Sequence, residues 1–307
     1  MNILKQEYKR LKRHNINVVD LPVIDFLQEN LNELFERSTL IILNTVDRAV
    51  QVYDFLREEL GNRKVYLIHS RFTYDDRRAR EEDITNARIL VSTQVSEVSL
   101  DISYGNLITE LAPIPSLIQR FGRVNRYGEW GTLGGNVYIC RQESEKPYSY
   151  AEFIITDDIL PELINGLRGC GEETYLKVVD KYYEELISET TDEIERACSY
   201  AERALDIHEF FYRLKTHSPE EIFGREPSYL AVPSCYLTRV KQLKQEMNSY
   251  KDYYKRKELL ARLKSYFISV PEHIIERDGR WDDELNLYTV GFRHYIYSSQ
   301  KGLVRRS

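Results

Sequence analysis

The sequence predicts an α/β fold in which a parallel sheet is flanked by helices, followed by a mostly α-helical C-terminal extension. Two observations lead to this prediction. In the first half of the chain, short apolar runs alternate with longer amphipathic stretches, which is typical of strand–helix–strand crossover units. A polar stretch with a proline at residues 141–150 then marks a change to mainly helical patterns. We therefore expect one domain at residues 1–145 and an accessory domain at residues 146–307.

Five runs in the first half are short and apolar, and they predict strands. They lie at residues 39–43, 64–68, 88–91, 106–110 and 136–139. Helices are expected at residues 22–37, 46–60, 73–84 and 115–123, and Gly61 closes the second of them. Ligands of parallel sheets bind at the carboxyl ends of the strands, so the chemistry is expected in the loops after Leu43, Ile68, Val91 and Glu110.

The second half of the chain predicts helices and one late strand. Helices are expected at residues 157–167, 172–187, 192–214 and 238–268, and an alternating pattern at 288–297 predicts an edge strand. Basic residues and tyrosines accompany each other at 236–254. This stretch fits a helix that lines a channel for a nucleic-acid strand, and it fits a solvated charged helix equally well.

Composition limits the classes of function. The 307 residues carry a formal charge of −6 with a pI of about 5.7, so any nucleic-acid contact must rest on a local groove or on backbone amides. The four cysteines form no C-x-x-C pair, which disfavours a zinc site and a disulfide framework. No apolar run reaches the roughly 18 residues of a membrane span. A cytoplasmic protein without a membrane partner is expected.

The segment QRFGRVNRYG at residues 119–128 places Arg120, Arg123 and Arg126 three residues apart, just past a predicted helix. Cleavage of a phosphoanhydride needs charged, planar donors that meet the negative charge on the transferred phosphoryl group. Arginine offers this fork at fixed geometry. The alternative is a solvated basic turn.

A second segment, ILVSTQVSEVSLDI at residues 89–102, combines a buried strand, a hydroxyl-rich loop and one acid. Hydroxyls such as that of Ser99 suit phosphate contacts, and Asp101 suits the hydroxyls of a ribose. Serine and threonine after a strand are also common helix caps. The arginine series about 20 residues later strengthens the nucleotide interpretation.

These two segments resemble motifs five and six in the second RecA-like domain of superfamily 2 helicases. Further stretches are similar to one branch of that superfamily, the CRISPR-associated helicase-nucleases of type I systems. They are ILNTV at 42–46, HSRFTYDDR at 69–77, TQVSEVSLDI at 93–102 and LAPIPSLIQRFGRVNR at 111–126. Together they cover about 100 residues in the expected order.

The resemblance implies a role for each matching residue. Arg123 and Arg126 would be arginine fingers that reach the γ-phosphate of ATP, and Gln119 would sense that phosphate. Asp101 and Ser99 would contact the nucleotide, while Arg120 would form an internal ion pair that braces the loop. The residues that match contacts to the tracking DNA strand are Asn44, Thr45, His69, Ser70, Arg71, Arg77, Thr93 and Gln94. Local capping or surface pairing remains the alternative for each of these.

Two features of the family are not found in this sequence. A G-x-x-x-x-G-K-[ST] phosphate cradle does not occur, so ATP and Mg²⁺ are expected to be bound mainly by a first RecA-like domain, in the same or another polypeptide. None of the six histidines is followed by aspartate, so the nuclease metal site of the family is not expected here. The chain alone is predicted not to hydrolyse ATP.

We therefore expect the C-terminal half of an ATP-dependent DNA helicase of CRISPR antiviral defence. Its implied partners are single-stranded DNA, the first RecA-like domain, a nuclease domain and a type I surveillance complex. Two alternatives remain: a superfamily 2 helicase of another pathway, and a non-catalytic module that binds nucleic acid or a partner protein.

Overall fold

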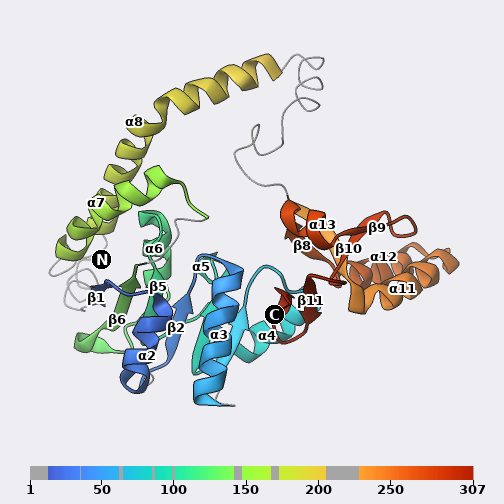
Figure 1. The fold of residues 1–307 in the computed structure, drawn as a ribbon, viewed down its shortest axis with the longest axis horizontal. Coiled ribbons are helices and arrows are strands. Elements are labelled where there is room, and N and C mark those ends of the chain that lie inside the picture. Colours follow the sequence, from blue (N-terminus) through green and yellow to red (C-terminus); the bar gives the residue numbers. More distant parts are fainter. Residues whose placement is uncertain are drawn as a thin grey trace. The chain divides into compact units, whose positions relative to one another are not determined.

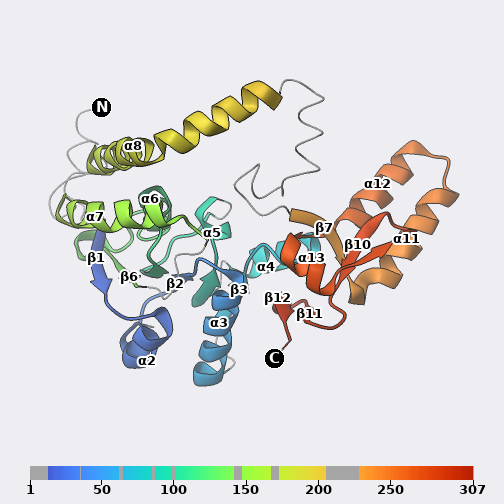
Figure 2. The same ribbon diagram turned by 45° about the horizontal axis from the view of Figure 1, so that its top comes forward.

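The computed structural model describes residues 13–34, 36–61, 65–84, 87–98, 101–141, 147–166, 173–204 and 228–306. The chain forms two compact units, which are described separately (Figures 1 and 2). Unit 1 comprises Met1–His69 and Glu81–Thr190, and unit 2 comprises Ser70–Arg80 and Thr191–Ser307. The limits of these units differ from the domain boundary expected between residues 145 and 146. That boundary stays a prediction.

Unit 1 is built on a six-stranded sheet in the order β1-β6-β5-β2-β4-β3, in which all neighbouring strands are parallel. The strands are β1 (His14–Val19), β2 (Thr39–Ile42), β3 (Val65–Ile68), β4 (Ile89–Ser92), β5 (Asn106–Glu110) and β6 (Gly135–Cys140). Every residue of β2, β4 and β5 is buried, as expected for strands covered on both faces. The five predicted strands are confirmed to within one residue. Strand β1 was not predicted, because this edge strand is largely polar and half exposed.

Helices cover both faces of this sheet (Figure 1). They are α2 (Val23–Leu34), α3 (Val46–Leu60), α5 (Val95–Val98), α6 (Ile114–Phe121), α7 (Tyr150–Gly166) and α8 (Glu173–Ala204), while α4 (Tyr74–Ile84) contributes its first residues to unit 2. Helix α3 has the predicted limits: Thr45 caps its first turn, and Gly61 ends it at φ 64°. The helices expected at 172–187 and 192–214 form one helix up to Ala204, because neither glycine nor proline interrupts the chain there. Residues 205–214 lie outside the described part.

Helices α7 and α8 pack on the sheet of unit 1. Ile159 and Leu163 of α7 and Tyr182 of α8 belong to the same buried cluster as Leu107 of β5 and Phe121 of α6. Burial of a large apolar side chain contributes about 1.5–3 kcal/mol to folding. This shared core explains why the residues up to Thr190 group with the sheet.

Unit 2 contains a four-stranded sheet in the order β8-β7-β10-β9 and a two-stranded ribbon of β11 and β12. Its elements are β7 (Ser228–Pro233), α11 (Leu237–Ser249), α12 (Tyr253–Lys264), β8 (Ile268–Pro271), α13 (Glu272–Asp278), β9 (Arg280–Asp282), β10 (Leu287–Val290), β11 (Tyr295–Ser298) and β12 (Gly302–Arg305). One buried cluster joins the sheet to α13, and another joins it to α11 and α12. The predicted fold class, a parallel sheet flanked by helices with a helical C-terminal region, is confirmed.

Two predicted elements of unit 2 are interrupted. The helix expected at 238–268 is divided after Ser249, and Asp252 caps α12 by accepting a hydrogen bond from Lys255 N at 2.7 Å. The strand expected at 288–297 is divided by a loop at residues 291–294, whose four successive N–H groups donate to the carboxylate of Asp278. Burial acts to raise the pKa of Asp278, but these four bonds outweigh it and lower the pKa. The buried carboxylate therefore fixes a loop that periodicity alone does not reveal.

His14 predicts an acid-sensitive stability for unit 1. Its Nε2–H donates to Val124 O (3.0 Å) and its Nδ1 accepts from the Tyr175 hydroxyl (2.9 Å), which describes a neutral ring. Burial lowers the pKa of His14 to about 4 from 6.5. Below pH 6.5 the unfolded chain binds a proton at His14, whereas the folded chain does not until the pH approaches 4. The contribution of neutral His14 to the free energy of unfolding is therefore complete above pH 6.5 and is lost as the pH falls towards 4.

Because of the lowered pKa of His14, we expect the free energy of unfolding to fall by about 2 kcal/mol as the pH is lowered from 7.5 to 5. The chain has two tryptophans, so Trp130 fluorescence in a Trp281→Phe background reports urea unfolding of unit 1 alone. The control is His14→Gln, which should flatten this part of the pH profile. An identical decline in both proteins would contradict the assignment.

Candidate active site

Arg120 lies at the centre of a buried polar network near the carboxyl ends of β2 and β5. Its side chain is fully buried, and its Nε donates to Glu97 Oε1 at 2.8 Å. Its Nη1 donates to Thr109 Oγ1 (2.7 Å) and its Nη2 to Asn44 Oδ1 (2.9 Å). Further bonds reach the carbonyl of Glu110 (3.2 Å) and the hydroxyl of Tyr148 (3.1 Å). The expected role of Arg120 as an internal ion pair is confirmed.

Glu110, the last residue of β5, supplies a second buried carboxylate. It pairs with Arg48 Nε at 2.7 Å and accepts the main-chain N–H of Asn44. Burial raises the pKa of Glu110, and Arg48, the Asn44 N–H and Arg120 oppose that rise. Sequence reasoning missed Glu97, Glu110 and Arg48. The signal was present, because an acid that ends a fully buried strand requires a partner.

Arg123 lies beside the segment that precedes β5. Its carbonyl accepts the N–H of Tyr104 and the N–H of Asn125 donates to the carbonyl of Tyr104, both at 3.0 Å. Its half-buried guanidinium donates to the carbonyl of Glu97. Burial lowers the pKa of Arg123, and the neighbouring charge of Arg126 acts in the same direction. An arginine pKa remains far above neutrality, so the group is a cation at physiological pH.

Arg126 and Asp101 form an accessible ion pair. Their Nη2 and Oδ1 atoms are 3.5 Å apart, and the side chains are 35% and 76% exposed. The hydroxyl of Tyr127 donates to the same oxygen of Asp101 at 2.7 Å, and Ser103 Oγ accepts the main-chain N–H of Arg126 at 3.0 Å. The structure therefore brings together two residues that the sequence assigns to the nucleotide, Asp101 and Arg126, and adds Tyr127.

One expectation is corrected. The chemistry was expected in the loops at the carboxyl ends of the strands, but Arg123 and Arg126 lie in the connection from α6 to β6, next to the start of β5. The reason is the direction of α6, which leads from the carboxyl end of β5 back towards the start of β6. Gln119 is exposed in the last turn of α6, and Ser99 lies outside the described residues.

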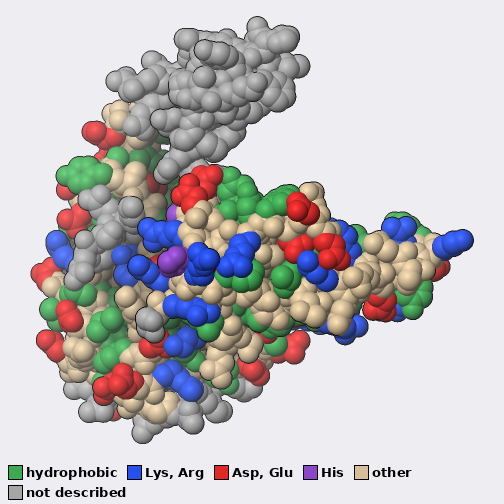
Figure 3. All heavy atoms as spheres, turned by 45° about the vertical axis from the view of Figure 1, so that its right-hand side comes forward, with side chains coloured by type: hydrophobic (Ala, Val, Ile, Leu, Met, Phe, Trp, Pro, Cys, Tyr) green, Lys and Arg blue, Asp and Glu red, His purple; other side chains and the backbone are tan. Residues whose placement is uncertain are grey.

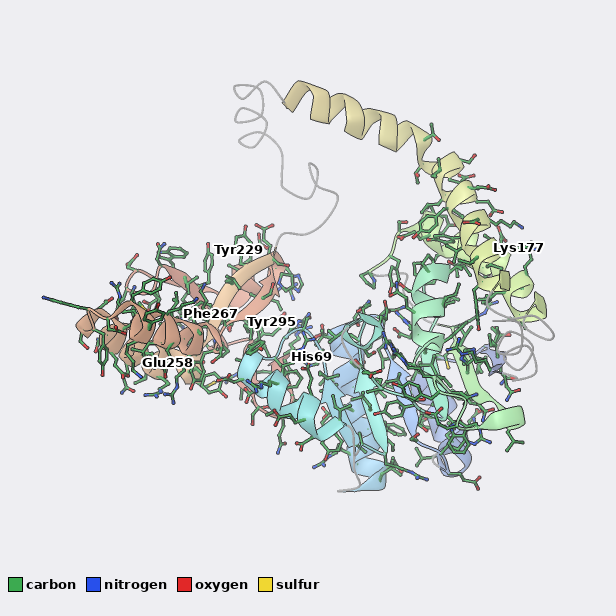
Figure 4. All side chains as sticks on the ribbon, turned by 180° about the vertical axis from the view of Figure 1, so that it is seen from behind. His69, Lys177, Tyr229, Glu258, Phe267 and Tyr295 are labelled. Atoms are coloured by element: carbon green, nitrogen blue, oxygen red, sulfur yellow. The ribbon has the colours of Figure 1, made fainter. Side chains whose placement is uncertain are left out.

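Five candidate nucleic-acid contacts belong to unit 1, and two of them, Asn44 and Gln94, are bonded into the buried network. Asn44 is buried, and its Nδ2 donates to Leu111 O at 2.8 Å while its Oδ1 accepts from Arg120. Gln94 is half-buried, and its Nε2 donates to the carbonyl of Asn44 at 2.9 Å. Thr45 caps α3. His69 and Thr93 are buried, at 0% and 3% exposure (His69 is labelled in Figure 4).

The other three candidates, Ser70, Arg71 and Arg77, belong to unit 2. Ser70 is exposed, Arg77 is half-buried in the first turn of α4, and Arg71 is buried with its carbonyl bonded to the N–H of Leu303 at 2.9 Å. Sequence reasoning did not foresee that C-terminal residues hold this segment.

Two C-terminal tyrosines fix the segment through Asp76. The Asp76 Oδ2 atom accepts the hydroxyls of Tyr297 (2.6 Å), Tyr236 (3.0 Å) and Thr73 (2.9 Å). Tyr297 is buried and also accepts the N–H of Thr73 at 2.9 Å. Burial raises the pKa of Tyr297, with a further rise from the hydrogen bond to Asp76. Some of the many tyrosines of this half therefore act as buried hydrogen-bonding partners.

Within the described residues, no group of three or more His, Cys, Asp or Glu side chains is placed to hold a metal ion. No helix in that part of the chain is both long and apolar enough to cross a membrane.

Comparisons with known proteins find similarity to one family of helicases. Residues 36–129 match the family described as "CRISPR-associated nuclease/helicase Cas3, C-terminal". In this stretch the chain is similar to a C-terminal part of the Cas3-type superfamily 2 helicases. It is 32% identical over 157 residues to the CRISPR-associated helicase Cas3 of Thermoproteus tenax, covering 48% of this chain and 26% of that protein. Against the CRISPR-associated endonuclease/helicase Cas3 of Escherichia coli, identity is 41% over 99 residues, covering 28% of this chain and 11% of that protein.

Solved Cas3 structures share the fold over nearly the whole chain. The crystal structure of T. fusca Cas3 with AMPPNP matches with a TM-score of 0.66 at 19% identity, covering 96% of this chain and 42% of that one. A structure described as a CRISPR RNA-guided surveillance complex, pre-nicking, gives 0.61 at 18% identity, covering 94% of this chain and 44% of that one. Unit 1 therefore has the RecA-like fold of Cas3. The chain spans about a quarter or less of the two curated relatives and less than half of the two solved chains.

The buried network predicts that Arg120 stabilises unit 1 far more than Arg126 does. Arg120→Ala leaves the buried carboxylate of Glu97 without its cation, and we expect a loss of about 3–5 kcal/mol in the free energy of unfolding. Arg120→Lys should recover little, because an ammonium group does not reach the same set of acceptors.

Arg126→Ala is the matched control, since its exposed pair with Asp101 is worth less than about 1 kcal/mol. The measurement is urea unfolding followed by Trp130 fluorescence in the Trp281→Phe background. Equal, small losses for both alanine variants would remove Arg120 from its structural role.

Proposed function

We propose that the chain supplies the second RecA-like lobe of an ATP-dependent DNA helicase that acts in CRISPR antiviral defence in the cytoplasm. The observation that carries this proposal is the division among three evenly spaced arginines. Arg120 is fully buried in the polar network, whereas Arg126 and the half-buried Arg123 lie near the exposed Asp101. The exposed ion pair between Arg126 and Asp101 adds little to the stability of the fold, so a structural role alone does not account for this guanidinium group.

In this proposal, Arg123 and Arg126 are arginine fingers directed at the γ-phosphate of a nucleotide held by another RecA-like lobe. The ion pair between Arg126 and Asp101 is exposed and 3.5 Å long, so it is weak and an incoming phosphate competes with it effectively. Release of Asp101 then frees a carboxylate to accept the hydroxyls of the ribose. Gln119 is exposed in the last turn of α6, four residues before Arg123, which suits a sensor of the same phosphate.

The residues present fit only one side of an ATP site. Two cations and one exposed acid suit the outer phosphate and the sugar, but no sequence for a phosphate cradle occurs in the 307 residues. We therefore assign most of the binding of ATP and Mg²⁺ to the first RecA-like lobe. When bound, ATP supplies the phosphoanhydride whose hydrolysis drives translocation.

For the DNA strand, the accessible candidates are Ser70, Thr45, Gln94 and Arg77, which are exposed or half-buried. We propose that they meet the phosphates of single-stranded DNA, and that the buried Asn44, His69, Arg71 and Thr93 hold the loops that carry them. A nuclease domain and a type I surveillance complex are proposed partners, supported by the names of the relatives and of the surveillance-complex structure.

The arginine assignment predicts a large, specific loss of ATP turnover. The chain is combined with a first lobe that carries the phosphate-binding loop, and ATP hydrolysis is measured with and without single-stranded DNA. Arg123→Ala and Arg126→Ala should each lower the rate by about 10³–10⁵, the typical contribution of an arginine finger. The chain alone should show no turnover.

Arg141→Ala is the control, because Arg141 is 58% exposed in an ion pair with Asp20, away from the arginine segment in the sequence. It should keep the full rate. A wild-type rate from the Arg123→Ala mixture would refute the finger assignment. DNA binding without any DNA-stimulated hydrolysis in the wild-type mixture would instead identify a non-catalytic binding module.

A further inference from the structure

The turn that joins α11 to α12 exposes aromatic rings at the end of a helical pair. Tyr253 and Tyr254 are 70% and 80% exposed, and Tyr250 is 40% exposed. The rings of Tyr253 and Tyr254 meet edge to face, with centroids 5.6 Å apart and an interplanar angle of 77°. We call residues 250–257, YKDYYKRK, the hairpin tip.

These rings contribute little to the core of unit 2. The apolar contacts of α11 and α12 are made by other residues, including Val240, Leu243, Leu259 and Leu263, which are buried. Large apolar rings that remain in water forgo the favourable free energy of burial, and adjacent exposed rings commonly mark an interaction surface. The hairpin tip therefore has aromatic surface that the fold does not use.

Positive charge is concentrated at the same place. The tip contains four basic residues and one acidic residue, although the whole chain carries a net charge of −6. Among the described residues, Lys251, Arg256 and Lys257 take part in no ion pair, whereas Lys255 pairs with Glu258 at 2.9 Å. Figure 3 shows basic side chains at the outer end of this helical pair.

The basic residues of α11 are used differently. Lys241 pairs with Asp282 (2.7 Å) and Glu284 (3.2 Å), and Lys244 donates to the carbonyl of Glu284. The stretch at 236–254 that the sequence presents as one basic, tyrosine-bearing helix is therefore divided in function. In its first part, Lys241 and Lys244 are neutralised against β9 and the turn that follows, whereas three of the four basic residues of the tip take part in no ion pair.

Helical spacing places the cations next to the rings. Arg256 and Lys257 lie three and four residues after Tyr253, and Lys257 lies three residues after Tyr254, so they share faces of α12. Aromatic faces beside cations are what unpaired nucleic acid requires, because its bases stack and its phosphates attract positive charge.

A second aromatic group in unit 2 does not fit such a ligand. The rings of Trp281, Tyr288 and Tyr229 form a row across β9, β10 and β7, with centroid distances of 5.1 and 5.6 Å. However, the hydroxyl of Tyr229 donates to the carboxylate of Glu272 at 2.9 Å. An acid at that position repels phosphates, which distinguishes this row from the hairpin tip.

We propose that the hairpin tip is a binding site for single-stranded nucleic acid, separate from the helicase motifs. Tyr253 and Tyr254 stack on bases, and Lys251, Arg256 and Lys257 contact phosphates. This site does not depend on ATP hydrolysis or on the arginine fingers, so its failure and the failure of the proposed function are distinguishable.

The test is the affinity of the full chain for a fluorescent single-stranded oligothymidylate, measured by anisotropy at several salt concentrations. Tyr253→Ala/Tyr254→Ala should weaken binding at least about tenfold, given about 1–3 kcal/mol per stacked base. Tyr253→Phe/Tyr254→Phe keeps the aromatic faces and should retain the affinity. Lys257→Ala should reduce the slope of log affinity against log salt by about 0.7, the value for one phosphate contact on a single strand.

The control is Tyr150→Ala/Tyr183→Ala, a pair of tyrosines in unit 1 that are 64% and 47% exposed. It should bind as the wild type does. Urea unfolding followed by Trp281 fluorescence should show equal stability for all tip variants, since the rings are exposed. Unchanged affinity and salt slope in the alanine variant would overturn the proposal. Equally effective competition by poly-glutamate would also overturn it and indicate an acidic protein partner.

Discussion

The fold of unit 1 depends on the burial of one positive charge, the guanidinium of Arg120. Removing such a group from water costs several kcal/mol, and the cost is offset only if nearly every donor finds an acceptor. Arg120 achieves this with acceptors from β5, α5, the loop after β2 and Tyr148. Four segments that are distant in sequence must therefore keep one geometry, and α6 is held against them.

This constraint also joins the two sides of the proposed site. Asn44 and Gln94 match strand-contacting positions: Asn44 accepts a hydrogen bond from Arg120, and Gln94 donates to the carbonyl of Asn44. Glu97 accepts Arg120 on its carboxylate and Arg123 on its carbonyl. The loops assigned to DNA and the segment assigned to the nucleotide thus share one set of hydrogen bonds. If Arg123 moves towards a phosphate, its hydrogen bond to the carbonyl of Glu97 in α5 changes. The carboxylate of Glu97 is bonded to Arg120, which also bonds to Asn44 in the loop after β2.

Sequence reasoning succeeded where local chemistry decides the structure and failed where distant partners decide it. The limits of α3 follow from Thr45 and Gly61, and the apolar runs place five strands of the sheet to within one residue. By contrast, the partners of Arg120 come from four segments. The tyrosines that fix Asp76 lie 160 and 221 residues away in the sequence. No proline or glycine marks the interruption of the predicted helix before Asp252. Such features depend on tertiary contacts, which the hydrophobic periodicity of a sequence does not report.

The acidic composition of the chain is a poor guide to its partners, because many acids are already used inside the fold. Glu97 pairs with the buried Arg120 and Glu110 with the half-buried Arg48, Asp278 is bonded to four backbone amides, and Asp282 pairs with Lys241. A charge that is paired at close range contributes little beyond the screening length of about 8 Å at physiological salt. The charges that we propose for contact with phosphates are therefore local: Arg123 and Arg126 on unit 1, and the hairpin tip on unit 2. A chain with net negative charge therefore still presents cations locally: Arg126 in a weak, exposed ion pair on unit 1, and Lys251, Arg256 and Lys257 of the hairpin tip on unit 2.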